Sequence, residues 1–212
     1  GRACSAAGVQ FLFGLEVNEI MRADDKLIVA SDSSEGIDAD AVVLASGSYT
    51  PSLAALVGLR VPVTPVKGYS ITVPRGDWHD GPRIPVADDH LHTAVTPLGD
   101  RIRVAGTAEF TGHDTTLTAA RIDNLYLLLE AIYPEFARRL DRRSAKPWCG
   151  FRPMSADGVP ILGPTRIPEL YVNTGQGHLG WTMAAGSGKA VADSIVGVPA
   201  EIKVDDYSLA RF

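Results

Sequence analysis

The chain has 212 residues, of which 45% are hydrophobic and 21% charged, and its formal net charge is −5. This composition suits a globular protein with a buried core, and an acidic chain without a basic cluster excludes nucleic acid as an expected partner. The two cysteines, Cys4 and Cys149, lie far apart in the sequence and form no zinc-binding or disulfide pattern, which is typical of a protein in a reducing compartment. No apolar run reaches the roughly 18 residues that a membrane span needs.

The first part of the chain predicts short helices and strands. We expect the tail of a helix closed by Gly8, because glycine favours the left-handed conformation at a helix end. Residues 41–45 form a short, continuously apolar run, typical of a strand buried in a parallel sheet. The run ends in a Ser-Gly-Ser turn, a position where open α/β sheets bind ligands. A helix is expected over 51–57. Further strands are expected over 9–13, 16–21 and 26–31.

The middle of the chain, 62–146, has a different texture. Short β-rich runs lie between prolines, which predicts an antiparallel sheet with a hairpin turn at 98–100. Apolar residues at helical spacing then predict an amphipathic helix over 117–133, with Thr116 or Thr118 as its cap.

The last part of the chain returns to the first texture. The Gly/Pro-rich segment GFRPMSADGVPILG predicts a loop that ends in a short strand. A second strand is expected over 170–173 and a helix over 181–196. The fold class is therefore α/β, in an α+β composite: an incomplete Rossmann-like α/β part, 1–61 and 147–212, is interrupted by an antiparallel part, 62–146.

A G-x-G-x-x-G pattern lies between the last strand and helix, at Gly175, Gly177 and Gly180. A P-loop is excluded, because Met183 and Ala190 stand where it needs glycine and Ser or Thr. A Rossmann fingerprint needs a second strand after the helix, and too little of this sequence follows. What remains is a glycine turn before a helix N-terminus, which favours an anionic or electron-rich ligand. The alternative is a tight turn packed against a sheet.

Four blocks in this order resemble the FAD-dependent D-amino acid oxidoreductase (DAO) superfamily, and within it the bacterial D-amino acid dehydrogenases (small subunit). They are ADAVVLASGSYT, PVKGYSITVP, GFRPMSADGVPILG and NTGQGHLGWTMAAGSGKAVAD. In that superfamily the fingerprint for the FAD pyrophosphate lies near the N-terminus of the full chain. The resemblance therefore implies a C-terminal half, with 1–61 and 147–212 in the FAD-binding domain and 62–146 as the substrate-binding domain.

The resemblance implies roles for single residues. Arg152, in the GFRP block, is expected to hold the substrate carboxylate, for which a guanidinium is the natural bidentate partner. The alternative is a surface salt bridge. Tyr69 is expected either to bind the carboxylate and line the pocket or to pack in the core. His178 is expected beside the flavin or in a structural hydrogen bond. Lys67 is expected to be solvated, with a position near the flavin as the alternative.

FAD is expected to bind non-covalently, because some relatives attach flavin through a cysteine whose position here is Gly150, next to Cys149. Backbone N–H groups from Gly180 to Met183 are expected to meet the pyrimidine end of the isoalloxazine, where a helix N-terminus stabilises negative charge. The residues expected to bind the cofactor are Val17, Ala45, Ser46, Gly47, Gly150, Gly177, Gly180, Trp181, Thr182 and Met183. For the strand-end residues the alternative is plain packing.

The activity that the resemblance implies is oxidative deamination of D-amino acids to 2-oxo acids. Hydride passes from Cα to FAD N5, so Glu109 and Asp157 are expected to be structural and not general bases. Electrons go to a quinone or another respiratory acceptor, which implies a cytoplasmic protein peripheral on the inner membrane face. One alternative is an oxygen-using glycine, sarcosine or D-amino acid oxidase. Another is a non-catalytic fragment that binds no flavin alone and associates into homo-oligomers through an exposed sheet edge.

Overall fold

The structure is a computed structural model that describes residues 1–24, 26–32 and 34–212. The chain folds into two compact units. Unit 1 comprises Gly1–Val63 and Ser155–Phe212, and unit 2 comprises Thr64–Met154. The second boundary lies further along the chain than the change of texture at 146, because strand β9 (Lys146–Ser155) runs unbroken through that region and belongs to the sheet of unit 2.

Unit 1 contains two three-stranded sheets, of order β1-β2-β3 and β10-β11-β4. The first is antiparallel throughout, whereas in the second β11 pairs in parallel with β4. Parallel pairing brings the carboxyl ends of β4 and β11 to the same edge of the sheet. The strands are β1 (Glu19–Ala23), β2 (Lys26–Ser31), β3 (Ser34–Ala39), β4 (Val42–Leu44), β10 (Ile161–Pro164) and β11 (Leu170–Thr174).

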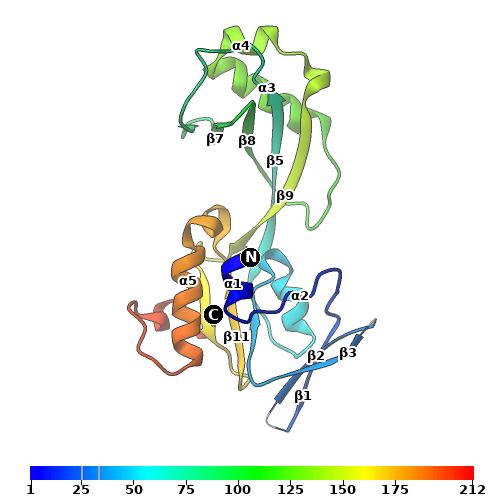
Figure 1. Cartoon of the computed structure of the whole chain (residues 1–212), viewed down its shortest axis with the longest axis vertical. Coiled ribbons are helices and arrows are strands. Elements are labelled where there is room, and N and C mark those ends of the chain that lie inside the picture. The colour runs from blue at the N-terminus through cyan, green and yellow to red at the C-terminus, as the bar shows by residue number, and fades with distance from the viewer. Residues whose placement is uncertain (25, 33) are drawn as a thin grey trace. The chain divides into compact units, whose positions relative to one another are not determined.

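Helix α5 (Gly180–Ile195) is the long helix of unit 1 and lies along β11 in Figure 1. Ala190 and Val191 of α5 are buried. The strands bury a core together with the short helix α2 (Thr50–Ala55). Leu170, Val172 and Ile161 are fully buried there. A shorter helix, α1 (Arg2–Ala6), begins the chain, and Gly8 follows it with φ 88°, as expected of a helix end.

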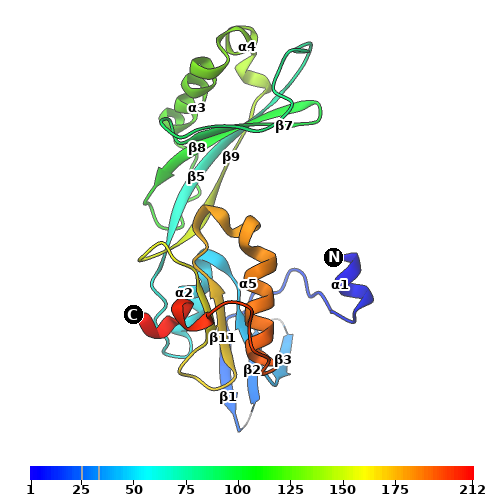
Figure 2. The same cartoon turned by 90° about the vertical axis from the view of Figure 1, so that its left-hand side faces the viewer.

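Unit 2 is one five-stranded sheet of order β6-β7-β8-β5-β9, with α3 and α4 on one face, as Figure 2 shows. Side chains alternate across it, so Ile102 and Val104 are fully buried toward the helices while Arg103, between them, is exposed. The elements are β5 (Val63–Pro74), β6 (Val86–Asp88), β7 (Thr93–Leu98), β8 (Arg101–Glu109), α3 (Ala119–Ile132), α4 (Pro134–Arg139) and β9.

The predicted composite of an α/β part and an antiparallel part is confirmed. The hairpin turn also lies where expected, with Gly99 at φ 66° between β7 and β8. The predicted helix over 117–133 is α3, and Thr118 is its N-cap residue without a capping hydrogen bond. The Thr118 hydroxyl lies 3.2 Å from the hydroxyl of Tyr69. The 3₁₀ turns are Gly47–Tyr49, Arg142–Ser144, Gly177–Leu179, Val204–Tyr207 and Leu209–Arg211.

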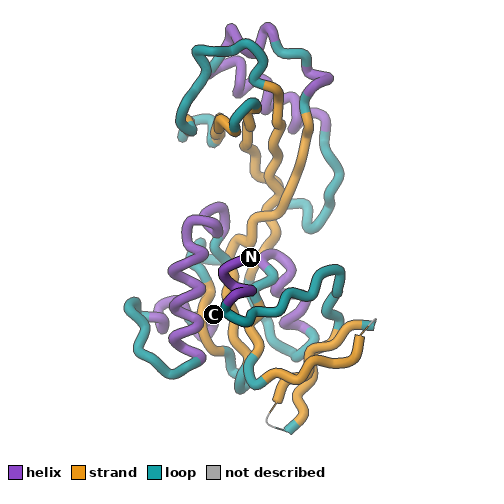
Figure 3. The backbone as a smooth tube through the Cα atoms, in the orientation of Figure 1, coloured by secondary structure: helices purple, strands orange, loops and turns teal. Residues whose placement is uncertain are grey.

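Three local predictions were wrong. Residues 9–13 form an exposed loop and not a strand, as Figure 3 shows, because they have no partner strand among the described residues. The segment 150–155 is part of β9 and not a loop, since pairing with β5 overrides its glycine and proline content. Strand β3 lies where only a turn was expected after β2. Within the described residues, no helix is long and apolar enough to cross a membrane.

Candidate active site

Arg152 is half-buried on strand β9 and has no carboxylate partner among the described residues. One guanidinium nitrogen donates to the carbonyl oxygen of Thr107 at 3.0 Å. Burial lowers the pKa of Arg152, but a guanidinium keeps its charge at any physiological pH. A partly buried cation held only by a carbonyl retains free donors for an anion, and a carboxylate is the best geometric match.

Two backbone features make room for this guanidinium. It packs directly against Gly68 of β5, where a Cβ atom would overlap three of its atoms. Thr107, whose carbonyl it contacts, has φ 68° at an irregularity in the β5–β8 pairing. A left-handed conformation is unfavourable for a β-branched residue, and such strain is concentrated at functional sites. The sheet is therefore shaped around Arg152.

A pocket of about 200 Å³ lies next to Arg152, wholly within unit 2. Its two exposed lining side chains are Arg103 and Trp148, and the others are partly or fully buried. Trp148 folds over Gly150, where a Cβ atom would overlap the indole ring. The lining residues are Gly68, Tyr69, Ser70, Arg103, Ala105, Trp148, Gly150, Phe151 and Arg152.

Tyr69 is buried, and its hydroxyl is already hydrogen-bonded within the protein. It donates to Glu109 Oε2 at 2.7 Å and lies 3.2 Å from the Thr118 hydroxyl. Its ring packs in the core of unit 2, on the side of α3. Tyr69 also borders the pocket, so it both packs in the core and lines the pocket, as the two alternatives expected. Its hydroxyl points away from the side of the strand on which Arg152 lies.

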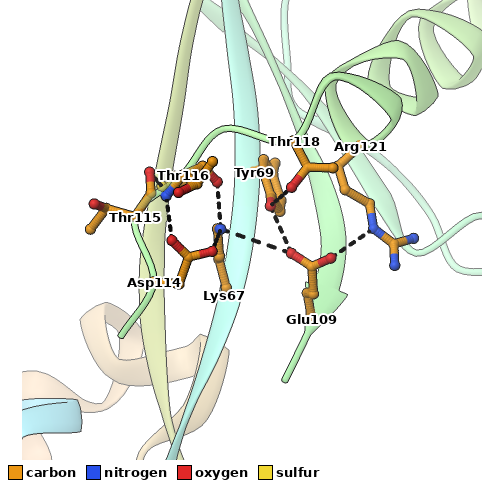
Figure 4. A network of polar contacts seen from close by, with 9 residues as sticks. Lys67, Tyr69, Glu109, Asp114, Thr115, Thr116, Thr118 and Arg121 are labelled. Carbon is orange, nitrogen blue, oxygen red and sulfur yellow. Dashed lines mark hydrogen bonds and ion pairs between the residues drawn. The ribbon is translucent and has the colours of Figure 1, made fainter. Parts of the chain in front are cut away.

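Lys67 was expected to be solvated, and this prediction is wrong: its side chain is fully buried. Its amine donates to Asp114 Oδ2 at 3.2 Å and to the carbonyl oxygen of Thr116 at 2.5 Å, and it lies 3.9 Å from Glu109 (Figure 4). Burial disfavours the charged amine, but contacts with Tyr69 and Asp114 outweigh it and raise the pKa of Lys67.

The carboxylates of this network are structural, as expected for Glu109. Glu109 accepts from Tyr69 and from Arg121 at 3.1 Å, and these hydrogen bonds lower its pKa. The pKa of Asp114 falls to about 2, first through hydrogen bonds from Thr116 and then through Lys67. Figure 4 shows the result: a Lys from β5 ties down the segment between β8 and α3.

The glycine-rich loop of unit 1 lies where two parallel strands end. Thr174, the last residue of β11, donates from its hydroxyl to the carbonyl oxygen of Gly47, just beyond β4. Gly47 and Gly177 adopt φ 58°, a conformation open to glycine, and each begins a 3₁₀ turn. The strand-end residues and the glycine loop predicted to bind a cofactor are thus side by side.

Helix α5 begins at this loop without a side-chain cap, so the positive end of its 16-residue dipole stays open. Trp181 is 96% exposed, and a Cβ atom at Gly180 would meet only Gln176, at 3.7 Å. An uncapped helix N-terminus with an open approach and an exposed indole fits the electron-rich edge of a flat ring. The residues present therefore fit the flavin that the resemblance implies.

The remaining residues that were predicted to bind the cofactor or substrate lie at the edge of the core, in turns or on the surface of unit 1. Val17 packs at the edge of the unit 1 core, Ala45 is exposed, and the Ser46 hydroxyl lies 3.2 Å from that of Thr50. His178 is exposed in the 3₁₀ turn before α5. Thr182 is exposed and Met183 half-buried in the first turn of α5.

Asp157, expected to be structural, is held by Arg211 in unit 1. Arg211 donates to both Asp157 oxygens, at 2.7 and 3.0 Å, and this pair lowers the pKa of Asp157.

Sequence reasoning missed the residues that shape the pocket: Gly68, Ser70, Arg103 and Trp148. One clue was available, because glycine inside a strand marks a close approach, and the KGYS block has such a glycine. Nothing in the sequence indicated that Arg103 and Trp148, far apart in the chain, line one space.

Comparisons with known proteins show the family of the chain. Residues 1–194 match the DAO family, described as FAD dependent oxidoreductase. The chain is 43% identical over 211 residues to a D-amino acid dehydrogenase of Granulibacter bethesdensis, covering 100% of this chain and 50% of that protein. It is 45% identical over 210 residues to one of Methylobacterium nodulans, covering 99% and 49%. The chain thus spans about half the length of these relatives.

The chain is also similar in fold to solved structures. Glycine oxidase from Geobacillus kaustophilus has a TM-score of 0.84 at 25% identity, covering 99% of this chain and 55% of that one. Iminodiacetate oxidase from Chelativorans sp. BNC1 has a TM-score of 0.83 at 25% identity, covering 98% and 55%.

Proposed function

Because the chain belongs to the DAO family of FAD-dependent oxidoreductases, we propose that it forms part of an enzyme that oxidatively deaminates D-amino acids. The observation that carries the proposal is Arg152: a half-buried guanidinium without a carboxylate partner among the described residues, beside a pocket. Relatives at 43% and 45% identity are named D-amino acid dehydrogenases, which supports this substrate class.

Arg152 binds the substrate carboxylate through its free guanidinium N–H groups and so fixes the orientation of Cα. Gly68 and the carbonyl of Thr107 hold the guanidinium in place. The loop from Gly177 to Met183 would hold the flavin, and the uncapped N-terminus of α5 would stabilise negative charge on it. FAD, when bound non-covalently, supplies the acceptor for the hydride that leaves Cα. The imino acid then hydrolyses to the 2-oxo acid.

The acceptor of the electrons is proposed to be a quinone or another respiratory carrier, which would bring the protein to the inner face of the cytoplasmic membrane. A second candidate is an oxygen-using oxidase, because two structural neighbours are named glycine oxidase and iminodiacetate oxidase. Oxygen consumption measured beside dye reduction separates the two: strong peroxide production would contradict the dehydrogenase.

The test of the site is flavin reduction by D-alanine and other D-amino acids in the full-length protein. Arg152→Ala should raise KM by about a hundredfold, since charged hydrogen bonds to the carboxylate are lost. The KM of Arg152→Lys should lie between those of the wild type and Arg152→Ala, because lysine keeps the positive charge but lacks the two parallel N–H donors of a guanidinium. Arg101→Ala is the matched control: it removes the same charge from an exposed arginine of β8 that does not line the pocket. An unchanged KM in Arg152→Ala would remove Arg152 from the carboxylate role.

A further inference from the structure

The pocket beside Arg152 has a second polar group, the hydroxyl of Ser70. Ser70 is 3% exposed, and its Oγ has no hydrogen-bond partner among the described residues. Buried polar groups in native proteins are almost always hydrogen-bonded, so an unpaired one calls for an explanation. In the part of the chain that the structure describes, Ser155 also has a buried hydroxyl without a hydrogen-bond partner, and it does not line the pocket.

Ser70 and the guanidinium of Arg152 lie on the same side of the sheet. Ser70 follows Gly68 by two positions on β5, so both face the same way, and Arg152 packs on Gly68. Positions two apart on a strand are separated by roughly 7 Å. One carboxylate spans such a distance when one oxygen accepts from a guanidinium and the other from a hydroxyl.

The rest of the pocket favours an anion over Ser70. Ser70 of β5 pairs with Ala105 of β8, and the small side chain of Ala105 lines the pocket beside it. The charged residues that line the pocket are both arginines, Arg103 and Arg152. The Ser70 hydroxyl is closed to water, so a ligand reaches it when an exposed lining side chain, Trp148 or Arg103, turns aside.

We propose that Ser70 is a substrate-binding residue that donates its hydroxyl hydrogen bond to the carboxylate held by Arg152. This rests on the proposed function, in which the carboxylate of a D-amino acid binds Arg152. The substrate then supplies the partner that Ser70 lacks, and the hydroxyl selects amino acids over amines without a carboxylate.

The experiment compares the full-length wild type with Ser70→Ala and Ser155→Ala by flavin reduction over a range of D-alanine concentrations. Ser70→Ala should weaken the apparent affinity for D-alanine about tenfold to a hundredfold, since a hydrogen bond to a charged group is lost. Its limiting reduction rate should change only a few-fold. Ser155→Ala should match the wild type, because it also removes a buried unpaired hydroxyl and keeps the Cβ that lies against Gly175.

A second readout is the thermal midpoint without substrate. Ser70→Ala should equal or exceed the wild type, because removing an unpaired buried hydroxyl relieves a penalty. Unchanged affinity for D-alanine would overturn the assignment of Ser70. So would a loss of affinity with a matching fall in the midpoint, which would make Ser70 a structural residue. A wild type that no D-amino acid reduces would overturn the proposed function itself, and the role of Ser70 with it.

Discussion

The position of Arg152 depends on the absence of a side chain at Gly68. At Gly68 a Cβ atom would overlap the guanidinium, so only glycine lets the arginine lie flat on β5. Thr107 supplies its carbonyl from a left-handed conformation. The missing side chain at Gly68 on β5 and the carbonyl of Thr107 on the neighbouring strand β8 thus hold one cation in place without a partner carboxylate among the described residues.

Gly68→Ala should damage binding more than stability. The guanidinium is the far end of a flexible side chain, so it can move at small cost in folding free energy, but it then leaves its position by the pocket. A misplacement of this kind can cost about tenfold to a hundredfold in KM for D-alanine, measured by flavin reduction in the full-length protein.

Gly81→Ala is the control for this prediction. It crowds the ring of Trp78, which stacks on Phe136 in the core of unit 2 and does not line the pocket. This variant should lower the thermal midpoint and leave KM unchanged. Equal effects of the two substitutions on KM would contradict the role given to Gly68.

At the scale of elements, the polar network around the buried Lys67 anchors the segment that connects β8 to α3. Lys67 reaches from β5 to Asp114 and to the backbone of Thr116 in the connecting segment. At the end of that segment, the Thr118 hydroxyl lies 3.2 Å from the hydroxyl of Tyr69 and does not cap α3. Side chains of one strand therefore replace the missing helix cap as the anchor of this connection.

This network predicts a pH dependence of stability. The pKa of Asp114 is lowered from 3.8 to about 2, so its stabilising contribution is fully present above pH 4 and is lost as the pH falls toward 2. Asp114→Asn should lower the urea midpoint of the chain at pH 7, and the gap to the wild type should narrow below pH 4.

The matched control is Asp100→Asn, since that side chain is 92% exposed and its ion pair is weak. It should leave the urea midpoint almost unchanged at either pH. A gap for Asp114→Asn that stays constant from pH 7 to pH 3 would show that the carboxylate does not stabilise the fold through its charge.

At the scale of the whole molecule, apolar residues of unit 1 remain on the surface. Phe11 and Phe13 are 45% and 89% exposed, and their rings stack with centroids 6.0 Å apart. Val9 and Leu12 are exposed in the same loop. Exposed apolar residues gathered in one segment favour association with other apolar surfaces.

We therefore expect the 212-residue chain by itself to self-associate as its concentration rises, which light scattering or sedimentation will measure. Replacing Phe11 and Phe13 by serine should shift it toward the monomer. Val196→Ser is the control, because that residue is 69% exposed but lies away from the loop in sequence. A chain that stays monomeric at high concentration would contradict this expectation.

Much of the architecture follows from local patterns. The apolar spacing that predicted a helix over 117–133 gives α3 because one face of it is buried by the sheet. The KLIVAS run is β2, as expected. The prediction failed at 9–13, where β propensity alone does not make a strand without a neighbour to pair with. It failed again at β9, where a neighbouring strand overrode the local signs of a loop.

The sequence by itself determined the family and the alternation of the α/β and antiparallel parts, and it gave the prediction that Arg152 binds a carboxylate. All three rest on blocks of adjacent residues. Only the tertiary structure decided that Lys67 is buried and that Ser70, Arg103 and Trp148 share a pocket with Arg152. The physical reason is that burial and polar partners come from strands distant in the chain. The Lys67 amine donates to Asp114 and to the backbone of Thr116, which lie more than forty positions away, so the local sequence could not indicate these partners.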